Sequence, residues 1–345
     1  MGNMVVIRGP KEIGYSETVD LPLKSGEVRL QMLYSGISAG TQLTLYRGNN
    51  PYITKSFNPE LRVFEESNHN SSPYPIPGAW AYEEVGRICE VGPDVKSVSE
   101  GMIVYGTWGH RTSQIVTEEY CLTHLLPSNV DPIIGIFSQM GAIALNAILD
   151  ADIHVGETIA VFGQGVPGQI VSQLARLNGA DVIAVDRNDY RLRMAKELGA
   201  SVTLNSDNCD AGLEIKRLTG RGADKSIEIS GSPSALHAAI RSCSYNGKVV
   251  CSGFMTQESL GLVLGEEFHH NRIQLICSQI ENTGPHVRDT WNRIRMEQTI
   301  FHLCQNGKLD LLSLITHRFP YTEAEQAYAM LDKSTDCMQT VLEFN

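Results

Sequence analysis

The sequence predicts an α/β protein made of a β-rich unit and a domain with a doubly wound parallel sheet. Two observations lead to this prediction. The first 130 residues hold short β-like runs punctuated by glycine, proline and asparagine, which is typical of a small, irregular all-β unit. From about residue 156 the pattern alternates between buried strands and amphipathic helices, which indicates a parallel sheet covered by helices. A length of 345 residues suits about two such domains.

The β-rich unit is expected to contain short strands with one long connection. The connection, residues 47–77, is polar and proline-rich without a clear period, and it carries Tyr52, Phe57, Phe64 and Tyr74. A connection of this length is usually functional or mobile, so we expect either a lid over a substrate cleft or a disordered insertion. The expected strands are residues 4–9, 27–37, 83–92, 101–106 and 112–125.

The remaining chain is expected to alternate strand and helix and then to return to the first domain. We therefore divide the chain into a first domain at 1–135, a parallel-sheet domain at 136–285 and a return at 286–345. The return should open with a long helix at 286–307. Expected strands of the sheet are 157–163, 181–188, 201–205, 223–231 and 248–254, with helices at 167–179, 189–200, 209–220 and 232–247.

The stretch VFGQGVPGQ predicts a dinucleotide-binding turn. Gly163, Gly165 and Gly168 form G-x-G-x-x-G between an apolar strand and a helix, and Asp186 ends the next strand 23 residues after Gly163. The three glycines allow a tight turn, close approach of the pyrophosphate and close packing of helix on strand. Val166 and Pro167 open the helix, whose N-terminus would hold the pyrophosphate.

The residues around this turn favour NAD over NADP. Asp186 should accept hydrogen bonds from the adenosine ribose and repel a 2′-phosphate. Arg187 and Arg191 lie beside it and leave NADP open, because arginines at that strand end can bind a 2′-phosphate. Ser252 and Gly253 end a later strand and are expected to form a wall for the nicotinamide.

The bulk properties exclude several classes of partner. A net charge of −11 without lysine or arginine runs argues against nucleic acid and anionic membranes. We expect no membrane span and no signal peptide. The eight cysteines show no C-x-x-C pair, which fits a reducing cytoplasm rather than a zinc knuckle. The expected partner is a small-molecule substrate.

The whole chain resembles the medium-chain dehydrogenase/reductase superfamily. The resemblance is carried by VGRICEVGPDV, by the GQGVPG turn and by LITHRFPYTEAEQAYAMLD near the C-terminus. It implies a GroES-like catalytic domain and a Rossmann dinucleotide domain. The stretches YSGISAGTQLTLYRG and SLITHRFP look most like the branch that contains bacteriochlorophyllide-type hydroxyethyl dehydrogenases. Members are commonly dimers or tetramers, so the resemblance implies a homo-oligomer.

The resemblance also implies that the zinc site of the family is lost. Ser38 stands at the position of the family's cysteine ligand, and Tyr82 replaces the histidine of its G-H-E-x-x-G motif while Glu83 is kept. Ser138-Gln139 stands near the third ligand position, and the four-cysteine structural lobe is absent. Hydroxyl groups do not hold zinc at neutral pH, so no metal is expected. The resemblance also implies that Gln339 replaces a basic residue that contacts the pyrophosphate in many relatives.

Without a metal, protein side chains must exchange the hydroxyl proton of the substrate. Four candidates compete. Tyr82 could donate its phenol proton, Glu83 could act as a base if burial raises its pKa, and His110 has a natural pKa that suits proton transfer. Ser38, together with Thr41, could hydrogen-bond the substrate or the nicotinamide ribose and could start a proton relay.

The sequence therefore predicts a zinc-independent, NAD-linked oxidoreductase that interconverts a secondary alcohol and its ketone. The alcohol would be a polyol, a sugar-like compound or a biosynthetic intermediate. One alternative is an NADPH-dependent enoyl or quinone reductase, although Asp186 argues against NADPH. A second alternative is a nucleotide-binding module without catalysis.

Overall fold

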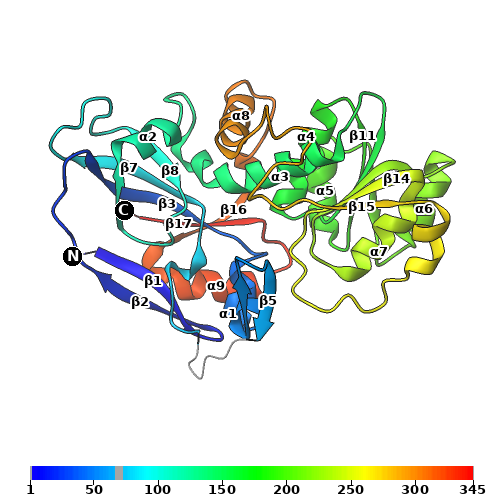
Figure 1. Cartoon of the computed structure of the whole chain (residues 1–345), viewed down its shortest axis with the longest axis horizontal. Helices are drawn as coiled ribbons and strands as arrows, with labels where there is room; N and C mark the ends of the chain where they lie inside the picture. Colours follow the sequence, from blue (N-terminus) through cyan, green and yellow to red (C-terminus); the bar gives the residue numbers. More distant parts are fainter. Residues whose placement is uncertain (1, 67–72, 345) are drawn as a thin grey trace. The chain divides into compact units, whose positions relative to one another are not determined.

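The computed structural model describes residues 2–66 and 73–344 and divides into two compact units (Figure 1). The first unit comprises the chain up to residue 137 and again from residue 315, and the second comprises residues 138–314. The first is β-rich and the second holds a parallel sheet with helices. The predicted α/β fold class, a GroES-like domain with a Rossmann domain, is confirmed.

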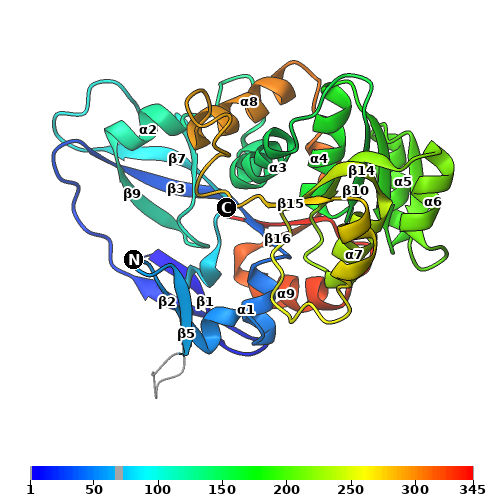
Figure 2. The same cartoon turned by 45° about the vertical axis from the view of Figure 1, so that its right-hand side comes forward.

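The first unit is built on a sheet with the order β16-β17-β3-β7-β8. Strand β9 also pairs with β3, and Figure 2 shows both strands together with β7. A sheet of order β2-β1-β6 and a separate hairpin, β4-β5, complete its strands. The bounds are β1 Gly2–Gly9, β2 Glu12–Thr18, β3 Glu27–Ile37, α1 Gln42–Arg47, η1 Pro51–Ile53, β4 Lys55–Asn58, β5 Val63–Glu66, β6 Ile76–Pro77, η2 Gly78–Trp80, β7 Glu84–Val91, β8 Ile103–Gly106, β9 Ser113–Thr117, α2 Glu118–His124, η3 Pro132–Phe137, β16 Ile315–Pro320, η6 Tyr321–Glu323, α9 Ala324–Lys333 and β17 Gln339–Glu343.

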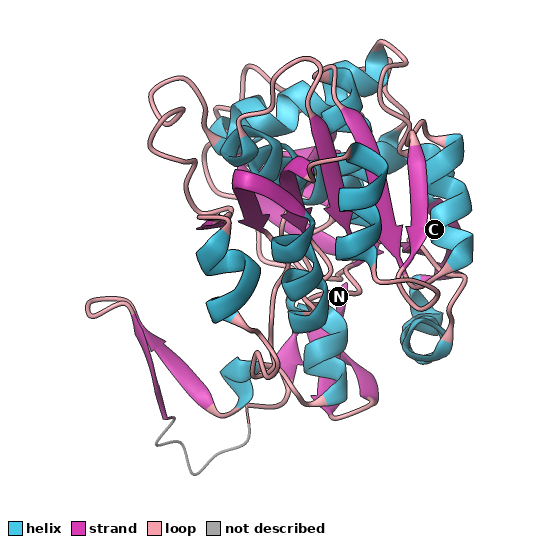
Figure 3. Ribbon diagram, turned by 90° about the vertical axis from the view of Figure 1, so that its right-hand side faces the viewer, coloured by secondary structure: helices cyan, strands magenta, loops and turns pink. Residues whose placement is uncertain are grey.

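The second unit holds a parallel sheet of order β12-β11-β10-β13-β14-β15 with helices on both faces (Figure 3). The order reverses between β10 and β13, and ligands of such sheets bind at the carboxyl ends of the strands beside that point. The bounds are α3 Ser138–Ala151, β10 Thr158–Phe162, α4 Val166–Leu177, β11 Asp181–Asp186, α5 Asp189–Glu197, β12 Val202–Asn205, α6 Ala211–Thr219, β13 Ala223–Glu228, α7 Pro233–Ser242, β14 Cys243–Cys251, η4 Leu264–Phe268, β15 Gln274–Cys277, α8 Arg293–Gln305 and η5 Leu312–Leu314.

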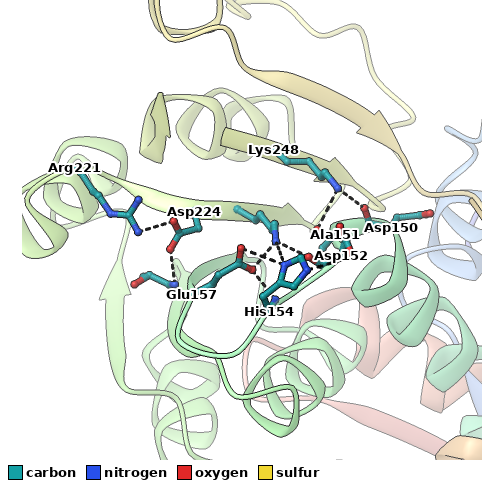
Figure 4. Close-up of polar contacts among 10 residues, drawn as sticks. Asp150, Ala151, Asp152, His154, Glu157, Arg221, Asp224 and Lys248 are labelled. Carbon is teal, nitrogen blue, oxygen red and sulfur yellow. Dashed lines mark hydrogen bonds and ion pairs between the residues drawn. The ribbon is translucent and has the colours of Figure 1, made fainter. Parts of the chain in front are cut away.

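Lysines of two inner strands, β13 and β14, reach the carboxyl end of α3, as Figure 4 shows for Lys248. The Nζ of Lys225 donates to the carbonyl of Asp152 and to the carboxylate of Glu157, each at 2.5 Å. The Nζ of Lys248 donates to the carbonyl of Asp150 at 3.2 Å. Cations at a helix C-terminus satisfy its last carbonyls and the negative end of its dipole. The positions of Lys225 and Lys248 are therefore explained by capping of the C-terminus of α3.

The return to the first unit begins later than predicted. The sequence placed it at residue 286, but residues 286–314 belong to the second unit. The reason is α8, which packs on α3 at Gly141: a Cβ there would lie 2.7 Å from a side-chain carbon of Ile300. The expected helix at 286–307 is also shorter, because Asn292 caps α8 by accepting a hydrogen bond from the Arg295 N–H at 2.9 Å.

Two further expectations in the first unit need correction. The strand expected at 112–125 ends at Thr117, whose side chain caps α2 by accepting from the Tyr120 N–H at 3.2 Å. The connection 47–77 holds η1 and the β4-β5 hairpin, so its described part is not a structureless insertion. Part of the predicted lid, residues 67–72, lies outside the described residues.

Among the described residues, one stretch is long and apolar enough to cross a membrane by length and composition alone. It is Pro132–Ala151, with 20 residues and a mean hydropathy of 1.7 over its most apolar window. Most of that window is buried inside the protein, and a core helix has the same composition. Its apolar character is thus explained by packing.

Candidate active site

Three hydroxyl groups meet between the end of β3 and the start of β7. Ser38 follows β3, Thr41 precedes α1 and Tyr82 precedes β7. The Oγ of Ser38 lies 2.5 Å from the hydroxyl of Tyr82, and the Oγ1 of Thr41 lies 3.0 Å from it. Ser38 is buried and Tyr82 is partly exposed. The structure thus brings together three of the residues that the sequence selected.

Glu83 lies against the end of β3, where only glycine leaves room for it. A Cβ on Gly36 would lie 2.1 Å from the Oε2 of Glu83 and 2.7 Å from the Nε2 of Gln339. The N–H of Gly36 donates to the carbonyl of Glu83 at 2.8 Å. The glycine in YSGIS is therefore required by the close approach of this carboxyl group.

Gln339 contacts Glu83 rather than open solvent. Its Nε2 donates to the Oε2 of Glu83 at 2.9 Å, and its side chain is buried in β17. An amide carries no charge, so it stabilises the Glu83 carboxylate less than a neighbouring cation would. Burial, and secondly the adjacent Glu84, raise the pKa of Glu83 to about 8. Glu83 is therefore mostly protonated at neutral pH.

Glu84 is a second buried carboxyl group that sequence reasoning missed. Its Oε1 accepts from the Ser35 hydroxyl at 3.0 Å and its Oε2 from the Trp108 N–H at 2.6 Å. Burial raises the pKa of Glu84 to about 7 in spite of these hydrogen bonds. The available sequence signal was a pair of consecutive carboxylates at the start of an apolar strand. Because successive side chains of a strand face opposite ways, the two carboxylates could not both point to the same side.

His110 belongs to a buried polar cluster rather than to an open site. Its Nδ1 lies 2.5 Å from the Oγ of Ser35, and its Nε2 lies 2.9 Å from the Oε1 of Gln42 and 3.0 Å from the hydroxyl of Tyr328. The ring is fully buried, which lowers its pKa to about 3. The predicted proton exchange by His110 is therefore not supported, because both nitrogens are occupied and the ring is neutral.

Tyr82 keeps its proton at physiological pH. Burial, with a smaller contribution from Glu83, raises the pKa of its phenol to about 12. The hydrogen bonds from Ser38 and Thr41 oppose this shift. A neutral phenol flanked by two hydroxyls can donate a hydrogen bond to a substrate oxygen while it accepts one from a neighbour.

The donor set of this site does not fit zinc. Zinc is bound by cysteine, histidine and, less often, carboxylate groups. Ser38 and Tyr82 supply hydroxyls that bond each other. Ser138 and Gln139, also selected from the resemblance, open α3 in the second unit and supply a hydroxyl and an amide. Across residues 2–66 and 73–344, no group of three or more histidine, cysteine or acidic side chains is placed to hold a metal.

In the second unit, the glycine turn has the geometry that a dinucleotide requires. Gly163 adopts a left-handed φ of 97°, and a Cβ on Gly168 would lie 1.8 Å from the carbonyl oxygen of Gly163. A Cβ on Gly165 would meet only Pro167, at 4.0 Å, so the space beside it is open. Val166 and Pro167 form the first turn of α4, whose N-cap has no side-chain partner. This cradle fits a pyrophosphate at a helix N-terminus.

Asp186 lies at the carboxyl end of β11, beside the glycine turn. Its two oxygens accept from the N–H groups of Gln164 at 2.6 Å and Asn188 at 2.9 Å, so its carboxylate is fixed in place. Arg187 points to Asp207, with its Nε 2.7 Å from the carboxylate. Arg191 contributes its carbonyl to the Gln169 amide at 2.8 Å. The arrangement fits a cofactor whose ribose hydroxyls face Asp186.

Ser252 and Gly253 lie just beyond β14, where both N–H groups donate to the carbonyl of Glu228, at 2.8 and 3.0 Å. Glu228 is buried at the end of β13 and accepts from Ser230 and Gly231. The hydroxyl of Ser252 is buried without a protein partner within the described chain. An unpaired buried hydroxyl beside the expected nicotinamide position is consistent with the predicted wall.

Comparison with known proteins identifies relatives of this chain. Residues 167–293 match the family model described as zinc-binding dehydrogenase. Along 94% of both chains, the sequence is 29% identical to D-guloside 3-dehydrogenase of Escherichia coli K12. Together these matches indicate the medium-chain dehydrogenase/reductase superfamily. The chain is an oxidoreductase of the alcohol dehydrogenase type, as the dehydrogenases among its relatives show.

Solved structures of dehydrogenases share this fold. Galactitol-1-phosphate dehydrogenase of E. coli superposes with a TM-score of 0.78 over 99% of both chains, at 20% identity. A structure described as a short chain alcohol dehydrogenase of E. coli CFT073, in complex with NADH, gives a TM-score of 0.77 over 99% of both chains, at 22% identity. The narrower resemblance to the bacteriochlorophyllide branch stays a prediction.

Proposed function

We propose that this superfamily member interconverts a secondary hydroxyl group of a sugar or glycoside and the corresponding ketone, with NAD(H) and without zinc. The observation that carries the proposal is the hydroxyl cluster at Tyr82, with Ser38 at 2.5 Å and Thr41 at 3.0 Å. The sequence resemblance implies that Ser38 and Tyr82 stand at metal-ligand positions of zinc-dependent relatives. The nicotinamide supplies the hydride chemistry when it is bound.

Tyr82 supplies the proton chemistry in this proposal. In ketone reduction its phenol donates a proton to the oxygen that gains charge, and the hydroxyls of Ser38 and Thr41 hold the phenol in place. A proton from solvent, relayed through these hydroxyls, then restores the phenol. In alcohol oxidation the same path runs in reverse. The protonated Glu83 keeps the neighbouring strand end neutral, so a second negative charge does not oppose the developing alkoxide.

The preference for NAD follows from Asp186 and its neighbours. Its carboxylate is fixed at the end of β11, where it would repel a 2′-phosphate. The charge of Arg187 is directed to Asp207 at 2.7 Å. Exposed ion pairs are weak, so the pair of Arg187 and Asp207 adds only a little to the preference for NAD, which rests mainly on Asp186.

The sugar substrate is proposed from the full-length relative. D-guloside 3-dehydrogenase matches along 94% of both chains, so the two proteins share the catalytic unit as well as the nucleotide unit. A glycoside hydroxyl is a secondary alcohol flanked by other hydroxyls. The hydroxyl-lined wall formed by Ser38 and Thr41 suits such a polyhydroxy compound.

The experiment is a turnover panel with a metal assay on the same purified protein. We expect oxidation of D-gulosides with NAD, little activity with NADP, and less than about 0.1 zinc per chain. Asp186→Ser should weaken NAD use and narrow the gap to NADP, and the control Asp207→Asn should leave NAD use nearly unchanged. Zinc-dependent activity, or turnover only of enones with NADPH, would refute the proposal.

A further inference from the structure

A row of four aromatic rings starts two residues from Tyr82 and runs along the β4-β5 hairpin. The ring of Trp80 lies 5.3 Å from that of Tyr52, and Tyr52 lies 5.2 Å from Phe64. Phe57 continues the row at 5.2 Å from Phe64. We call these four residues the aromatic row. Their exposed fractions are 45% for Trp80, 41% for Tyr52, 46% for Phe64 and 36% for Phe57, so every ring is accessible in the first unit.

The backbone before Tyr82 is strained in a way that presents Trp80. Ala79 and Trp80 both adopt left-handed conformations, with φ of 53° and 57°. Such conformations are unfavourable for residues other than glycine and tend to occur at functional sites. Ala79 is fully buried while Trp80 is exposed, so the strained turn directs the indole outward.

A second connection joins the row to the hydroxyl cluster. Asn50 is buried and caps η1 by accepting from the Tyr52 N–H at 3.0 Å. Its Nδ2 donates to the Oγ1 of Thr44 at 2.7 Å, and Thr44 donates to the carbonyl of Thr41 at 2.6 Å. Thr41 contacts Tyr82. The position of Tyr52 is therefore fixed relative to the candidate site through a short chain of hydrogen bonds.

The hairpin that carries Phe57 and Phe64 has no core of its own. All residues of β5 are exposed, as are three of the four in β4. In Figure 3 the hairpin projects from the remainder of the first unit. Isolated two-stranded hairpins are marginally stable, and exposed aromatic clusters usually mark a binding surface. This surface begins beside Tyr82, which favours the substrate over another macromolecule as its occupant.

We propose that the aromatic row binds a ring attached to the sugar that reacts, so that the substrate is a glycoside with a ring-bearing aglycone. This inference rests on the proposed function and specifies its substrate class. Aromatic side chains provide large contact area and stack on the apolar faces of rings. The ring could be an aryl group or a second sugar, since both present such a face.

The test compares methyl and phenyl D-gulosides, with a D-guloside of a second sugar as a third substrate. Wild-type protein should prefer the two ring-bearing compounds. Trp80→Ala and Phe64→Ala should each lower kcat/KM for them by up to about tenfold, mainly through KM, and leave the methyl glycoside within about twofold. Ala79 already shows that alanine fits the strained turn. Loss with only one ring-bearing compound identifies the source of the ring.

Leu61→Ala is the matched control, because Leu61 is 68% exposed at the turn of the same hairpin and lies outside the row. Equal losses on methyl and phenyl compounds, or no loss, would overturn the inference. A changed molecular mass in sedimentation for Trp80→Ala or Phe64→Ala would also overturn it by indicating contact between copies. Calorimetric binding of the phenyl compound separates the two proposals: row-dependent binding without turnover supports the inference while the proposed function fails.

Discussion

The hydroxyl oxygens of Ser38 and Tyr82 lie 2.5 Å apart, at the short end of the range for hydrogen bonds between hydroxyls. With Thr41 3.0 Å away on the same phenol, Tyr82 has two neighbours that can accept or donate. The pair therefore allows a proton to pass between a partly exposed phenol and a buried serine.

Replacing Tyr82 by phenylalanine should reduce turnover without reducing cofactor binding. Tyr82→Phe keeps the ring but removes the hydroxyl that donates to the substrate oxygen, so we expect kcat to fall by roughly 10²-fold or more. NADH affinity, followed by fluorescence titration, should stay within about twofold. The control Tyr245→Phe makes the same change at an exposed residue and should leave kcat unaltered. A loss below about threefold in Tyr82→Phe would remove Tyr82 from the mechanism.

Replacing His110 should reduce stability rather than catalysis. His110→Leu removes the ring that bonds Gln42, Tyr328 and Ser35 in the core, and we expect a loss of about 2–3 kcal/mol in the free energy of unfolding. Denaturant titration measures this loss. The kcat of the folded variant at low temperature should stay within about threefold of wild type. His269→Leu, at an exposed histidine, is the control for the substitution itself. A 10²-fold loss of kcat with unchanged stability would restore the catalytic role of His110.

The buried carboxyl groups should make the protein less stable as pH rises. Burial raises the pKa of Glu83 to about 8, above an ordinary value of 4.5. The folded state therefore binds more protons than the unfolded state between these values, and stability falls as pH increases through that interval. Glu84, with its pKa raised to about 7, acts in the same direction. His110 acts in the opposite direction, but only between its folded pKa of about 3 and its ordinary 6.5.

The interval from pH 6.5 to 8 thus isolates the carboxyl groups. We expect the free energy of unfolding to decrease across it by up to about 1.4 kcal/mol per pH unit for each proton released on unfolding. Glu83→Gln should flatten this decrease, whereas Glu100→Gln, at an exposed carboxylate, should not. Urea titrations at several pH values provide the measurement. An unchanged slope in Glu83→Gln would show that Glu83 has an ordinary pKa in the folded protein.

The sequence predicted most where the signal is local. The spacing of Gly163, Gly165, Gly168 and Asp186 encodes a turn and a strand end within 24 residues, and the structure shows both. Ser38 and Tyr82 were selected from their positions in family motifs, and the structure shows that their hydroxyls are in contact. The cluster of Gln42, His110 and Tyr328 was not predictable, because Gln42 and Tyr328 are 286 residues apart. The setting of His110 depends on burial created by α9, which no local pattern around residue 110 reveals.

The aromatic residues of the connection 47–77 illustrate the same limit. Tyr52, Phe57 and Phe64 were visible as aromatic residues in a polar segment, but their spacing has no period. Their alignment arises from the antiparallel register of β4 and β5, which places Phe57 opposite Phe64. The ring of Trp80 reaches Tyr52 because the backbone at Ala79 is left-handed, and no sequence pattern reveals that conformation.

Two glycines of the nucleotide turn should respond to alanine in opposite ways. A Cβ at Gly168 would lie 1.8 Å from the carbonyl oxygen of Gly163, so Gly168→Ala forces α4 away from β10 and should destabilise the second unit severely. At Gly165 the φ of −68° suits alanine, and the added Cβ meets only Pro167 at 4.0 Å. Gly165→Ala should therefore keep the thermal midpoint within about 2 °C of wild type.

The open space at Gly165 is the reason to expect a loss of cofactor affinity there. A methyl group in the cradle at the start of α4 excludes the pyrophosphate, and we expect NADH affinity to fall by at least about tenfold. Calorimetric titration of Gly165→Ala with NADH measures this directly, and circular dichroism verifies that the unit is folded. Gly265→Ala is the control, because an added Cβ at Gly265 has no atom within 4 Å. Gly156→Ala is unsuitable, because Gly156 has a left-handed φ of 86° that alanine disfavours. Undiminished NADH binding by folded Gly165→Ala would show that the dinucleotide does not lie on this turn.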